Sequence, residues 1–269
     1  MDAKRRRRKD TTNRPAKVPV ADPDAAIMPN KDGGHAPNYT PTAAVDGRRG
    51  FIVDADVTNE SVESPTTVPT VDRIAETFDE KPKKLLADSH HGDGQNLAGL
   101  DERGVEAYIP MDDGGDENPA RRDDPRTPVA RSDWERLPYT GKKNKRLAKS
   151  AFVYDASSDC YYCPMGRRLA YAKQTSDSRR VGTADYRIYR CVDCGDCGLS
   201  GVCARGKGAR TVRRDQHEVL REAMSQRMRS PSGRKEYRMR RWICETPFGV
   251  LKGRCASNWR RVVDERAMR

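Results

Sequence analysis

The sequence predicts an α/β protein whose sheet is mixed, followed by a small module organised by cysteines. Two observations predict this class: the order of apolar patterns over residues 39–110, and six cysteines between residues 160 and 203. In the first region, short β-rich segments alternate with segments of helical periodicity. Strand–helix–strand crossovers imply parallel pairing, whereas a hairpin is antiparallel, so one sheet containing both would be mixed.

The first elements are a hairpin and a helix. Tyr39–Val45 and Phe51–Val57 are rich in β-forming residues, and the sequence DGRRG between them is typical of a turn. These segments therefore predict an antiparallel hairpin. The spacing of apolar residues predicts an amphipathic helix over Thr66–Glu80, with Val68, Val71, Ile74, Ala75 and Phe78 on one face.

A strand–helix–strand unit comes next. Leu85–Ala87 is a short apolar run that predicts a buried strand, and Asp88 stands at its carboxyl end. The sequence GQNLAGLDERG predicts a helix that ends at Gly104, a good C-terminal capping residue, and VEAYIP predicts the second strand. Functional sites of open α/β sheets gather at the carboxyl ends of strands. Asp88 is therefore a candidate catalytic residue, although an Asp at this place is also an ordinary turn or cap residue.

Composition divides the chain into five segments. Segments rich in Pro, Gly and charged residues, without apolar periodicity, are expected to be irregular. We expect an irregular basic segment over 1–37, the sheet portion with Asp88 over 38–110, a polar linker or surface insertion over 111–150, the cysteine module over 151–210, and a basic helical part over 211–269.

The charge favours a polyanionic partner. The net charge is +12, and residues 205–269 hold 19 Lys or Arg against 7 Asp or Glu. Such an excess, mostly arginine, is typical of nucleic-acid contact, although a solvated basic face is the alternative. No apolar run is long enough to cross a bilayer, and the basic start MDAKRRRRKD has no apolar segment behind it, unlike a secretory signal. We expect a cytoplasmic protein with reduced cysteines.

The cysteine spacing predicts a structural zinc site. Two cysteines separated by two residues bind one tetrahedral Zn²⁺ well, and this spacing occurs at Cys160–Cys163, Cys191–Cys194 and Cys194–Cys197. A closed site of four thiolates would stabilise the module's fold and leave no open position for a substrate. Free buried thiols are the alternative. The favoured ligands are Cys163, Cys194, Cys197 and Cys203, with Cys160 and Cys191 as substitutes, and Cys244 and Cys255 are expected to take no part.

A basic helix contains a single acid near the C-terminus. In YRMRRWICETPFGVLK, residues 237–252, helical geometry puts Tyr237, Arg241, Glu245, Phe248 and Lys252 within an arc of about 80°. Pro247 is expected to kink this helix. The residues alone leave two interpretations open: surface ion pairs of Glu245 with Arg241 and Lys252, or a carboxylate that binds a divalent metal while the cations hold phosphates.

This segment resembles the glutamate helix of DDE transposases from bacterial insertion sequences. Their signature of a Tyr, an Arg, a catalytic Glu and a Lys seven residues on falls on Tyr237, Arg240 or Arg241, Glu245 and Lys252. The segments beginning DPDAAIMPN and PKKLLADSHH are similar to the middle of such enzymes, with the second catalytic Asp at Asp88. The family has Gly-Tyr where this chain has His90 and His91. CYYCPMG with CGDCGLSGVC is similar to a cysteine insertion in one branch, and the resemblance covers roughly residues 22–265.

The resemblance implies a ribonuclease-H-like fold and DNA transposition by Mg²⁺-dependent strand cleavage and transfer. It also implies DNA as partner, association with the nucleoid and self-association in a paired complex. The family's first catalytic Asp, on a central strand upstream of DPDA, matches no residue here. We therefore expect a domain that lacks its N-terminal part and the sheet's first strand, with doubtful activity alone. The alternatives are a non-catalytic zinc-containing DNA-binding protein derived from a transposase, and a zinc module without a DNA role.

Overall fold

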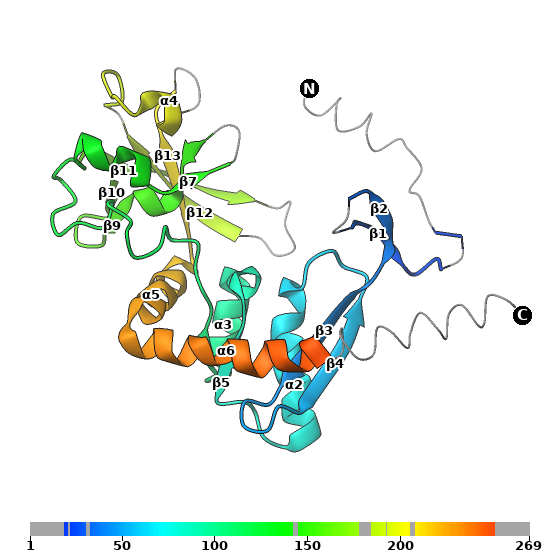
Figure 1. The fold of residues 1–269 in the computed structure, drawn as a ribbon. Coiled ribbons are helices and arrows are strands. Elements are labelled where there is room, and N and C mark those ends of the chain that lie inside the picture. The colour runs from blue at the N-terminus through cyan, green and yellow to red at the C-terminus, as the bar shows by residue number, and fades with distance from the viewer. Residues whose placement is uncertain are drawn as a thin grey trace, which may run out of the picture. The chain divides into compact units, whose positions relative to one another are not determined.

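The structure, a computed structural model, describes residues 19–20, 22–30, 33–141, 145–177, 184–191, 193–204 and 208–250. Its contacts divide the chain into two compact units, residues 1–82 with 239–269, and residues 83–238. Figure 1 shows strands and helices in both, which confirms the predicted α/β class.

The first unit contains two antiparallel hairpins and a helix. Its elements are β1 (Ala26–Pro29), β2 (His35–Asn38), β3 (Thr40–Val45), β4 (Ile52–Thr58) and α2 (Thr67–Phe78). Strand β1 pairs with β2, and β3 pairs with β4 from Thr40 opposite Thr58 to Val45 opposite Ile52. The predicted hairpin and the predicted helix are thus confirmed to within two residues at each end.

The turn between β3 and β4 depends on Asp46. Its side chain accepts hydrogen bonds from the backbone N–H groups of Arg48 (3.1 Å) and Arg49 (2.8 Å). Gly50 closes the turn with φ +74°, a conformation that favours glycine. Asp46 is therefore a turn residue, as its position in DGRRG predicts.

Helix α2 is tied to β4 by burial and by charge. Val71 is 1% exposed, and the Arg73 guanidinium lies 2.7 Å from Asp54 and 3.1 Å from Asp56, both on β4. The hydrogen bond from Arg73 lowers the pKa of Asp54. Asp79, in the left-handed conformation at φ 52°, ends the helix. The amphipathic pattern therefore determines which face of α2 meets the hairpin.

The second unit begins with the predicted strand–helix–strand unit. Strand β5 (Lys84–Leu86), α3 (Gly94–Glu102) and β6 (Glu106–Tyr108) follow one another, and β5 and β6 are parallel, with Lys84 opposite Glu106. Asp93 caps α3 by accepting hydrogen bonds from the N–H groups of Gln95 and Asn96, both at 3.0 Å. Gly104, at φ +66°, follows the helix. The predicted parallel pairing is confirmed.

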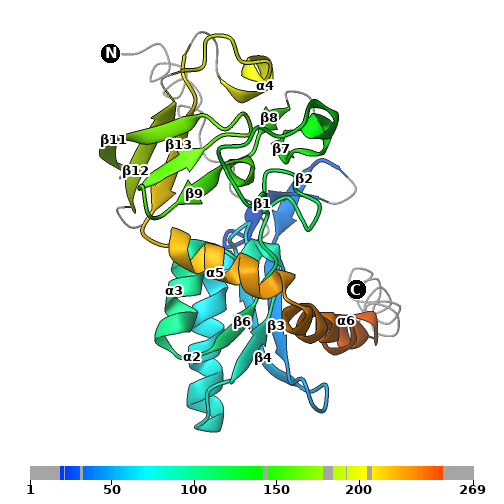
Figure 2. The ribbon, with the colours of Figure 1, turned by 90° about the vertical axis from the view of Figure 1, so that its left-hand side faces the viewer.

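Helix α5 (Glu218–Arg229) closes the outer edge of β6. The Arg227 guanidinium donates to the Ala107 carbonyl at 2.8 Å, and the Ile109 N–H lies 3.5 Å from the Met224 sulfur. Figure 2 shows α5 beside α3, and a Cβ on Gly94 would lie only 2.5 Å from the Cβ of His217. Glycine at this position therefore permits the close approach of α3 and α5.

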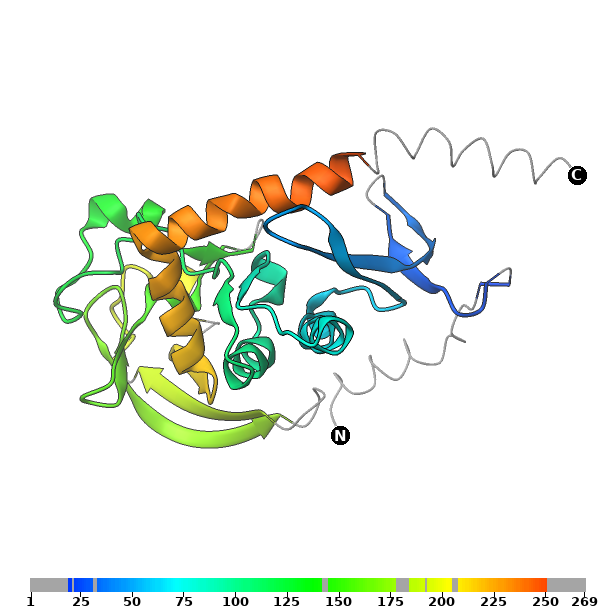
Figure 3. The ribbon, with the colours of Figure 1, turned by 90° about the horizontal axis from the view of Figure 1, so that it is seen from below.

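The rest of the second unit is built on a five-stranded antiparallel sheet of order β13-β12-β11-β10-β9. These strands are β9 (Val153–Asp155), β10 (Cys160–Tyr162), β11 (Arg168–Asp177), β12 (Ala184–Cys191) and β13 (Thr211–Asp215). Figure 3 shows the two long strands β11 and β12, in yellow-green, as a curved ribbon with α5 on its inner side. A two-stranded sheet of β7 (Tyr139–Thr140) and β8 (Arg146–Leu147), and the short α4 (Ser200–Cys203), complete the unit before α6 (Pro231–Val250) begins.

The core of this sheet includes residues from the segment expected to be a polar linker. Ala120 is fully buried, and Val129, Leu137 and Leu147 are at most 5% exposed in the same cluster as Tyr161, Leu169 and Tyr189. Residues 111–150 thus contribute apolar side chains to the cysteine module. The sequence does not reveal these few core residues, because isolated apolar positions between charged residues show neither helical nor strand periodicity.

The predicted single mixed sheet is not found among the described residues. The antiparallel pair β3–β4 and the parallel pair β5–β6 are separate two-stranded sheets. Local sequence determines a hairpin and a crossover unit, because each joins neighbouring segments.

An aspartate and three tyrosines support the five-stranded sheet. Asp159 accepts hydrogen bonds from the hydroxyls of Tyr189 (2.6 Å) and Tyr154 (2.8 Å), and Arg187 is paired with it. The rings of Tyr154, Tyr161 and Tyr189 pack at centroid distances of 5.0 to 6.0 Å. The hydrogen bond from Tyr189, followed by those from Tyr154 and Arg187, lowers the pKa of Asp159.

This lowered pKa predicts acid sensitivity. A carboxyl whose pKa is lower in the folded than in the unfolded state stabilises the fold above the unfolded value of about 3.9 and loses that contribution as the pH falls through the folded pKa. We expect the urea midpoint to fall below about pH 4, and Asp159→Asn to be less stable at neutral pH and to lose less on acidification. Asp123→Asn, on an exposed loop, is the control. An unchanged acid limb in Asp159→Asn would contradict the assignment.

Candidate functional site

Asp88 stands where the sequence places it, at the end of β5. It caps the turn Ser89–His91, and its Oδ1 accepts a hydrogen bond from the His90 N–H at 3.0 Å. Its side chain is 36% exposed. The strand end therefore presents a partly accessible carboxylate that is fixed by its own turn, as both the catalytic and the capping interpretation require.

Two histidines surround this carboxylate. The Nδ1 of His90 lies 3.4 Å and the Nε2 of His91 lies 3.9 Å from Asp88 Oδ1, with side chains 84% and 16% exposed. Two imidazole rings thus lie within 4 Å of this carboxylate.

Glu245 lies on α6, as the helical spacing predicts. The helix runs from Pro231 to Val250 and includes Pro247. Tyr237 and Arg240 are half-buried and Arg241 is exposed. Because Arg241 and Glu245 are four residues apart, they share a face of the helix. Lys252, the fourth predicted phosphate-binding residue, lies outside the described residues, as does Cys255.

The two acids belong to different units. Asp88 lies in the second unit, and Glu245 lies on the part of α6 that belongs to the first. Each unit is described separately, so the convergence of the two carboxylates stays a prediction of the sequence.

The predicted zinc ligands gather in one apolar cluster. Cys163, Cys191 and Cys203 are at most 8% exposed, and Cys194 and Cys197 pack against them. Burial raises the pKa of Cys163, and the nearby Cys197 and Cys194 raise it further. Burial likewise raises the pKa of Cys203 to about 11, with contributions from Cys163, Cys194 and Cys197. The four favoured thiols are therefore electrostatic neighbours.

Cys160 is separated from this cluster by the sheet. Cys160 pairs with Ala170 on β11, whereas Cys191 pairs with the adjacent Leu169. Successive residues of a strand point to opposite faces, so Cys160 and Cys191 lie on opposite sides of the sheet. Cys191 is the nearer substitute, because a hydrogen bond with Cys194 adds to the burial that raises its pKa to about 12.

Steric constraints require glycine at two positions beside the cysteines. Gly166 closes the turn after Cys163 at φ +72°, where a Cβ would collide with the backbone of Arg126. A Cβ on Gly198 would lie 2.7 Å from the Trp134 ring. These contacts explain the glycines at positions 166 and 198, and they connect residues 111–150 to the cysteine turns.

Within the described ranges, no group of three or more His, Cys, Asp or Glu side chains has the arrangement of a metal site. Over the same part of the chain, no helix has the length and apolarity needed to cross a membrane.

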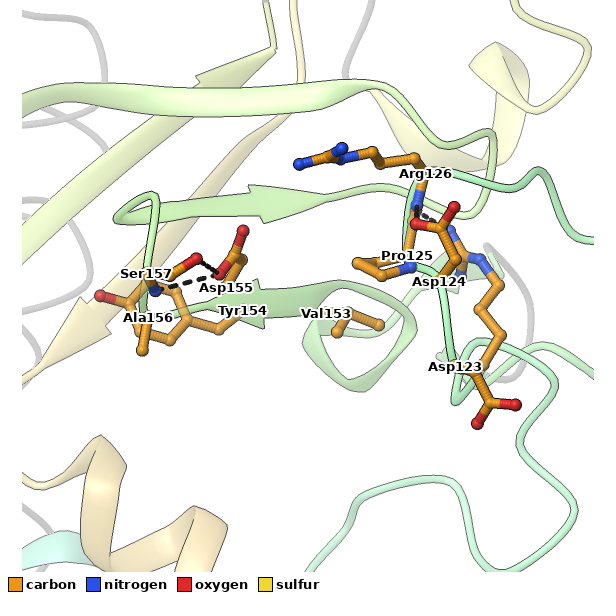
Figure 4. Close-up of a pocket in the computed structure, with 10 residues that line it drawn as sticks. Asp123, Asp124, Pro125, Arg126, Val153, Tyr154, Asp155, Ala156 and Ser157 are labelled. Atoms are coloured by element: carbon orange, nitrogen blue, oxygen red, sulfur yellow. Dashed lines mark hydrogen bonds between the residues drawn. The ribbon is translucent and has the colours of Figure 1, made fainter.

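A surface pocket of about 440 Å³ has none of the predicted site residues in its lining, although its Arg122 donates to the Cys163 carbonyl at 2.8 Å. It is lined by residues 122–126 and 153–157, and Figure 4 shows Asp124, Arg126, Asp155 and Ser157 around it. The carboxylates of Asp124 and Asp155 accept hydrogen bonds from the N–H groups of Arg126 (2.9 Å) and Ser157 (3.0 Å). The two acids thus stabilise turns at the rim of the pocket.

A group of charged side chains between β13 and α5 was not predicted from the sequence. Arg214, 8% exposed, donates to both carboxylate oxygens of Glu222 (2.5 and 2.9 Å) and lies 3.8 Å from the centroid of the Tyr154 ring. Asp215 pairs with Arg221 at 2.8 Å. The sequence did contain a signal for these ion pairs: RRD at the end of β13 is followed by α5, which has Glu218 and Glu222 in its first half.

The comparisons with known proteins give one match. The family model described as the transposase DDE domain matches residues 16–269, which is nearly the whole chain. No curated protein and no solved structure matches it.

Proposed function

Because the chain belongs to the transposase DDE domain family, we propose that it acts in DNA transposition through Asp88 and Glu245, as the second and third catalytic carboxylates. The observation that carries this proposal is the place of Asp88, at the carboxyl end of a strand in a parallel pair. Ligand-binding and catalytic groups of α/β sheets gather there. Glu245 follows Tyr237, Arg240 and Arg241 on one helix.

The donor set fits a hard divalent cation. Mg²⁺ prefers oxygen ligands, keeps several waters and is usually bound by one or two carboxylates together with substrate phosphates. Asp88, partly exposed on a short turn, is such a donor. When bound there, Mg²⁺ supplies the Lewis acidity that stabilises charge on a phosphate under attack.

The basic residues of α6 would position the DNA. Strand cleavage and transfer need in-line attack at a phosphate, first by water and then by a 3′-hydroxyl. Arg240 and Arg241 would hold that phosphate, since guanidinium forks match its oxygens, and Lys252 would add a point charge. Tyr237 would pack against sugar or base. Glu245, among these cations, would bring a negative charge to the phosphates without net repulsion.

We propose a ribonuclease-H-like arrangement for the sheet. The antiparallel pair β3–β4, the helix α2 and the parallel pair β5–β6 with its crossover helix α3 support it. In that arrangement, the family's first carboxylate stands on a strand between the two pairs, and this sequence offers no match for it. With two carboxylates, metal affinity and cleavage by this chain alone are expected to be weak.

The cysteine module is proposed to hold structural zinc through Cys163, Cys194, Cys197 and Cys203. The support is their common cluster and their mutual effects on pKa. Thiolates are the preferred ligands of structural zinc, and turns with two residues between cysteines are typical of such sites. Such a site would stabilise the module without taking part in strand transfer.

DNA is the proposed partner, with the chain located at the nucleoid in the cytoplasm and self-associating when it pairs two transposon ends. The second candidate function is DNA binding without catalysis. It is favoured by Asp88, whose carboxylate caps its own turn, and by the absence of a match for the first catalytic Asp.

A strand-cleavage assay on duplex DNA with Mg²⁺ or Mn²⁺ separates these functions. We expect weak cleavage by the parent chain, loss of cleavage with Glu245→Gln, and unchanged DNA affinity, because the substitution removes a metal ligand and leaves the cations in place. The matched control is Glu236→Gln, on the same helix and paired with Lys84 at 3.0 Å. DNA binding by the parent chain with cleavage that Glu245→Gln leaves unchanged would refute the catalytic role.

A further inference from the structure

The two faces of the five-stranded sheet differ in how their cations are neutralised. On the face that carries Tyr189, Arg187 pairs with Asp159, and Arg214 pairs with Glu222. The opposite face carries Lys173, Arg190 and Arg213, which are exposed. Among the described side chains, none of these three cations has an ion-pair partner within 4.0 Å. One face is thus internally balanced, and the other leaves its positive charge to the solvent.

The register shows that these three cations are neighbours. Ile188 pairs with Lys173 on one side and with Arg213 on the other, and Arg190 follows two residues later on the same strand. Cross-strand partners lie on the same face of a sheet. Strand spacing of about 4.8 Å and a rise of about 3.3 Å per residue put the three Cα atoms about 8 to 10 Å apart. We name Lys173, Arg190 and Arg213 the basic face.

The surroundings of the basic face suit a phosphate backbone. Arg213 lies 5.7 Å from the centroid of the half-buried Tyr186 ring, and Thr211 is exposed beside Arg190. Of the described acids on this face, Asp215 is already bound by Arg221 at 2.8 Å, and its side chain is 15% exposed. Asp155 lies on β9, the far edge strand, with three strands between it and the strand of Arg213 and Asp215. A cationic strand surface with an aromatic ring and a hydroxyl, whose nearest described acid is already paired, is complementary to a polyanion.

We propose that the basic face binds the phosphodiester backbone of duplex DNA, as a contact surface distinct from Asp88 and α6. This inference rests on the proposed function, since it takes DNA as the partner. The three cations are held on antiparallel strands, so their spacing is fixed by the sheet. Duplex DNA presents one charge per about 1.7 Å of its axis, so a surface of this width meets several phosphates.

The test compares binding of a random-sequence duplex by fluorescence anisotropy at several salt concentrations. The variant Lys173→Gln, Arg190→Gln, Arg213→Gln removes three cations from the basic face. The control Arg131→Gln, Arg136→Gln, Lys145→Gln removes three exposed cations from the same unit, where Arg131 lies over Trp134 and Arg136 is paired with Asp133. The charge-retaining variant Lys173→Arg, Arg190→Lys, Arg213→Lys completes the set.

Each phosphate contact adds about 0.9 to the slope of log affinity against log salt. We expect the basic-face variant to lose about 2.7 of that slope, so that raising salt from about 50 to about 200 mM weakens the parent chain about 40-fold more than the variant. The control and charge-retaining variants should keep the parent slope. Thermal unfolding should be unchanged in all, because the substituted residues are exposed.

The outcomes separate the two proposals. If the parent chain binds DNA with a steep salt slope and the basic-face variant has the same slope, the role of the basic face is refuted and the proposed function is not. Equal losses in the basic-face and control variants would also overturn that role, because net charge alone would then explain the binding. A parent chain without salt-dependent DNA binding would refute DNA as the partner.

Discussion

Asp88→Asn and Glu245→Gln are each expected to weaken binding of a divalent cation by about 100-fold or more. A lost outer partner of a metal ligand already costs 10- to about 100-fold, and each substitution here removes a charged ligand directly. Mn²⁺ binding, followed by the electron paramagnetic resonance signal of the free ion, measures this without requiring catalysis. The parent chain is expected to bind weakly, because the sequence supplies two of the family's three carboxylates.

The double variant shows whether the two carboxylates serve one ion. Two ligands of the same ion are coupled, so Asp88→Asn with Glu245→Gln should lose little more than either single variant. Glu236→Gln, on the same helix as Glu245, should bind like the parent chain. Additive losses, or single variants that each leave a full-affinity site, would mean that the two carboxylates bind separate ions.

Cys203→Ser is expected to remove zinc and unfold the cysteine module. Structural zinc sites contribute on the order of 10 kcal/mol or more to small metal-dependent folds, as much as the whole stability of many domains. Cys203 is 8% exposed and lies in the core cluster with Cys163 and Leu199. Zinc content, together with the near-ultraviolet circular dichroism of the packed tyrosines, reports both effects.

Cys160→Ser is the matched control. Cys160 is fully buried, like the cluster thiols, but lies on the other face of the sheet from Cys191. It should keep one zinc per chain and lose about 1 kcal/mol of stability, as an ordinary core substitution does. The zinc site would be refuted if the purified parent chain contained no zinc. It would also be refuted if Cys203→Ser kept full zinc and an unchanged spectrum, because the thiols would then be ordinary core residues.

Sequence patterns predicted the elements that depend on neighbouring residues. The hairpin around Asp46, the amphipathic helix ending at Asp79 and the crossover unit ending at Tyr108 all have local causes: a turn residue, a helical period and caps. Asp88 could be placed at a strand end for the same reason. The cysteine spacing likewise identified the thiols that gather in one cluster.

The features that sequence patterns missed depend on residues far apart in the chain. Asp159 meets Tyr189 across 30 positions, and Arg214 meets Tyr161 across 53. Ala120 enters the core of the cysteine module from a segment that composition alone predicts to be polar. Whether Asp88 and Glu245 meet is a question of the same kind, since 157 positions separate them.

Backbone cleavage by Fe²⁺ bound in place of Mg²⁺ tests most directly whether Asp88 and Glu245 bind the same metal ion. A bound Fe²⁺ with ascorbate and peroxide generates hydroxyl radicals that cut the polypeptide only close to the metal. We predict two sets of cuts, one beside Asp88 and one beside Glu245, both suppressed by excess Mg²⁺ and both lost in either Asp88→Asn or Glu245→Gln. Cuts beside one residue that survive removal of the other carboxylate would contradict the shared metal site.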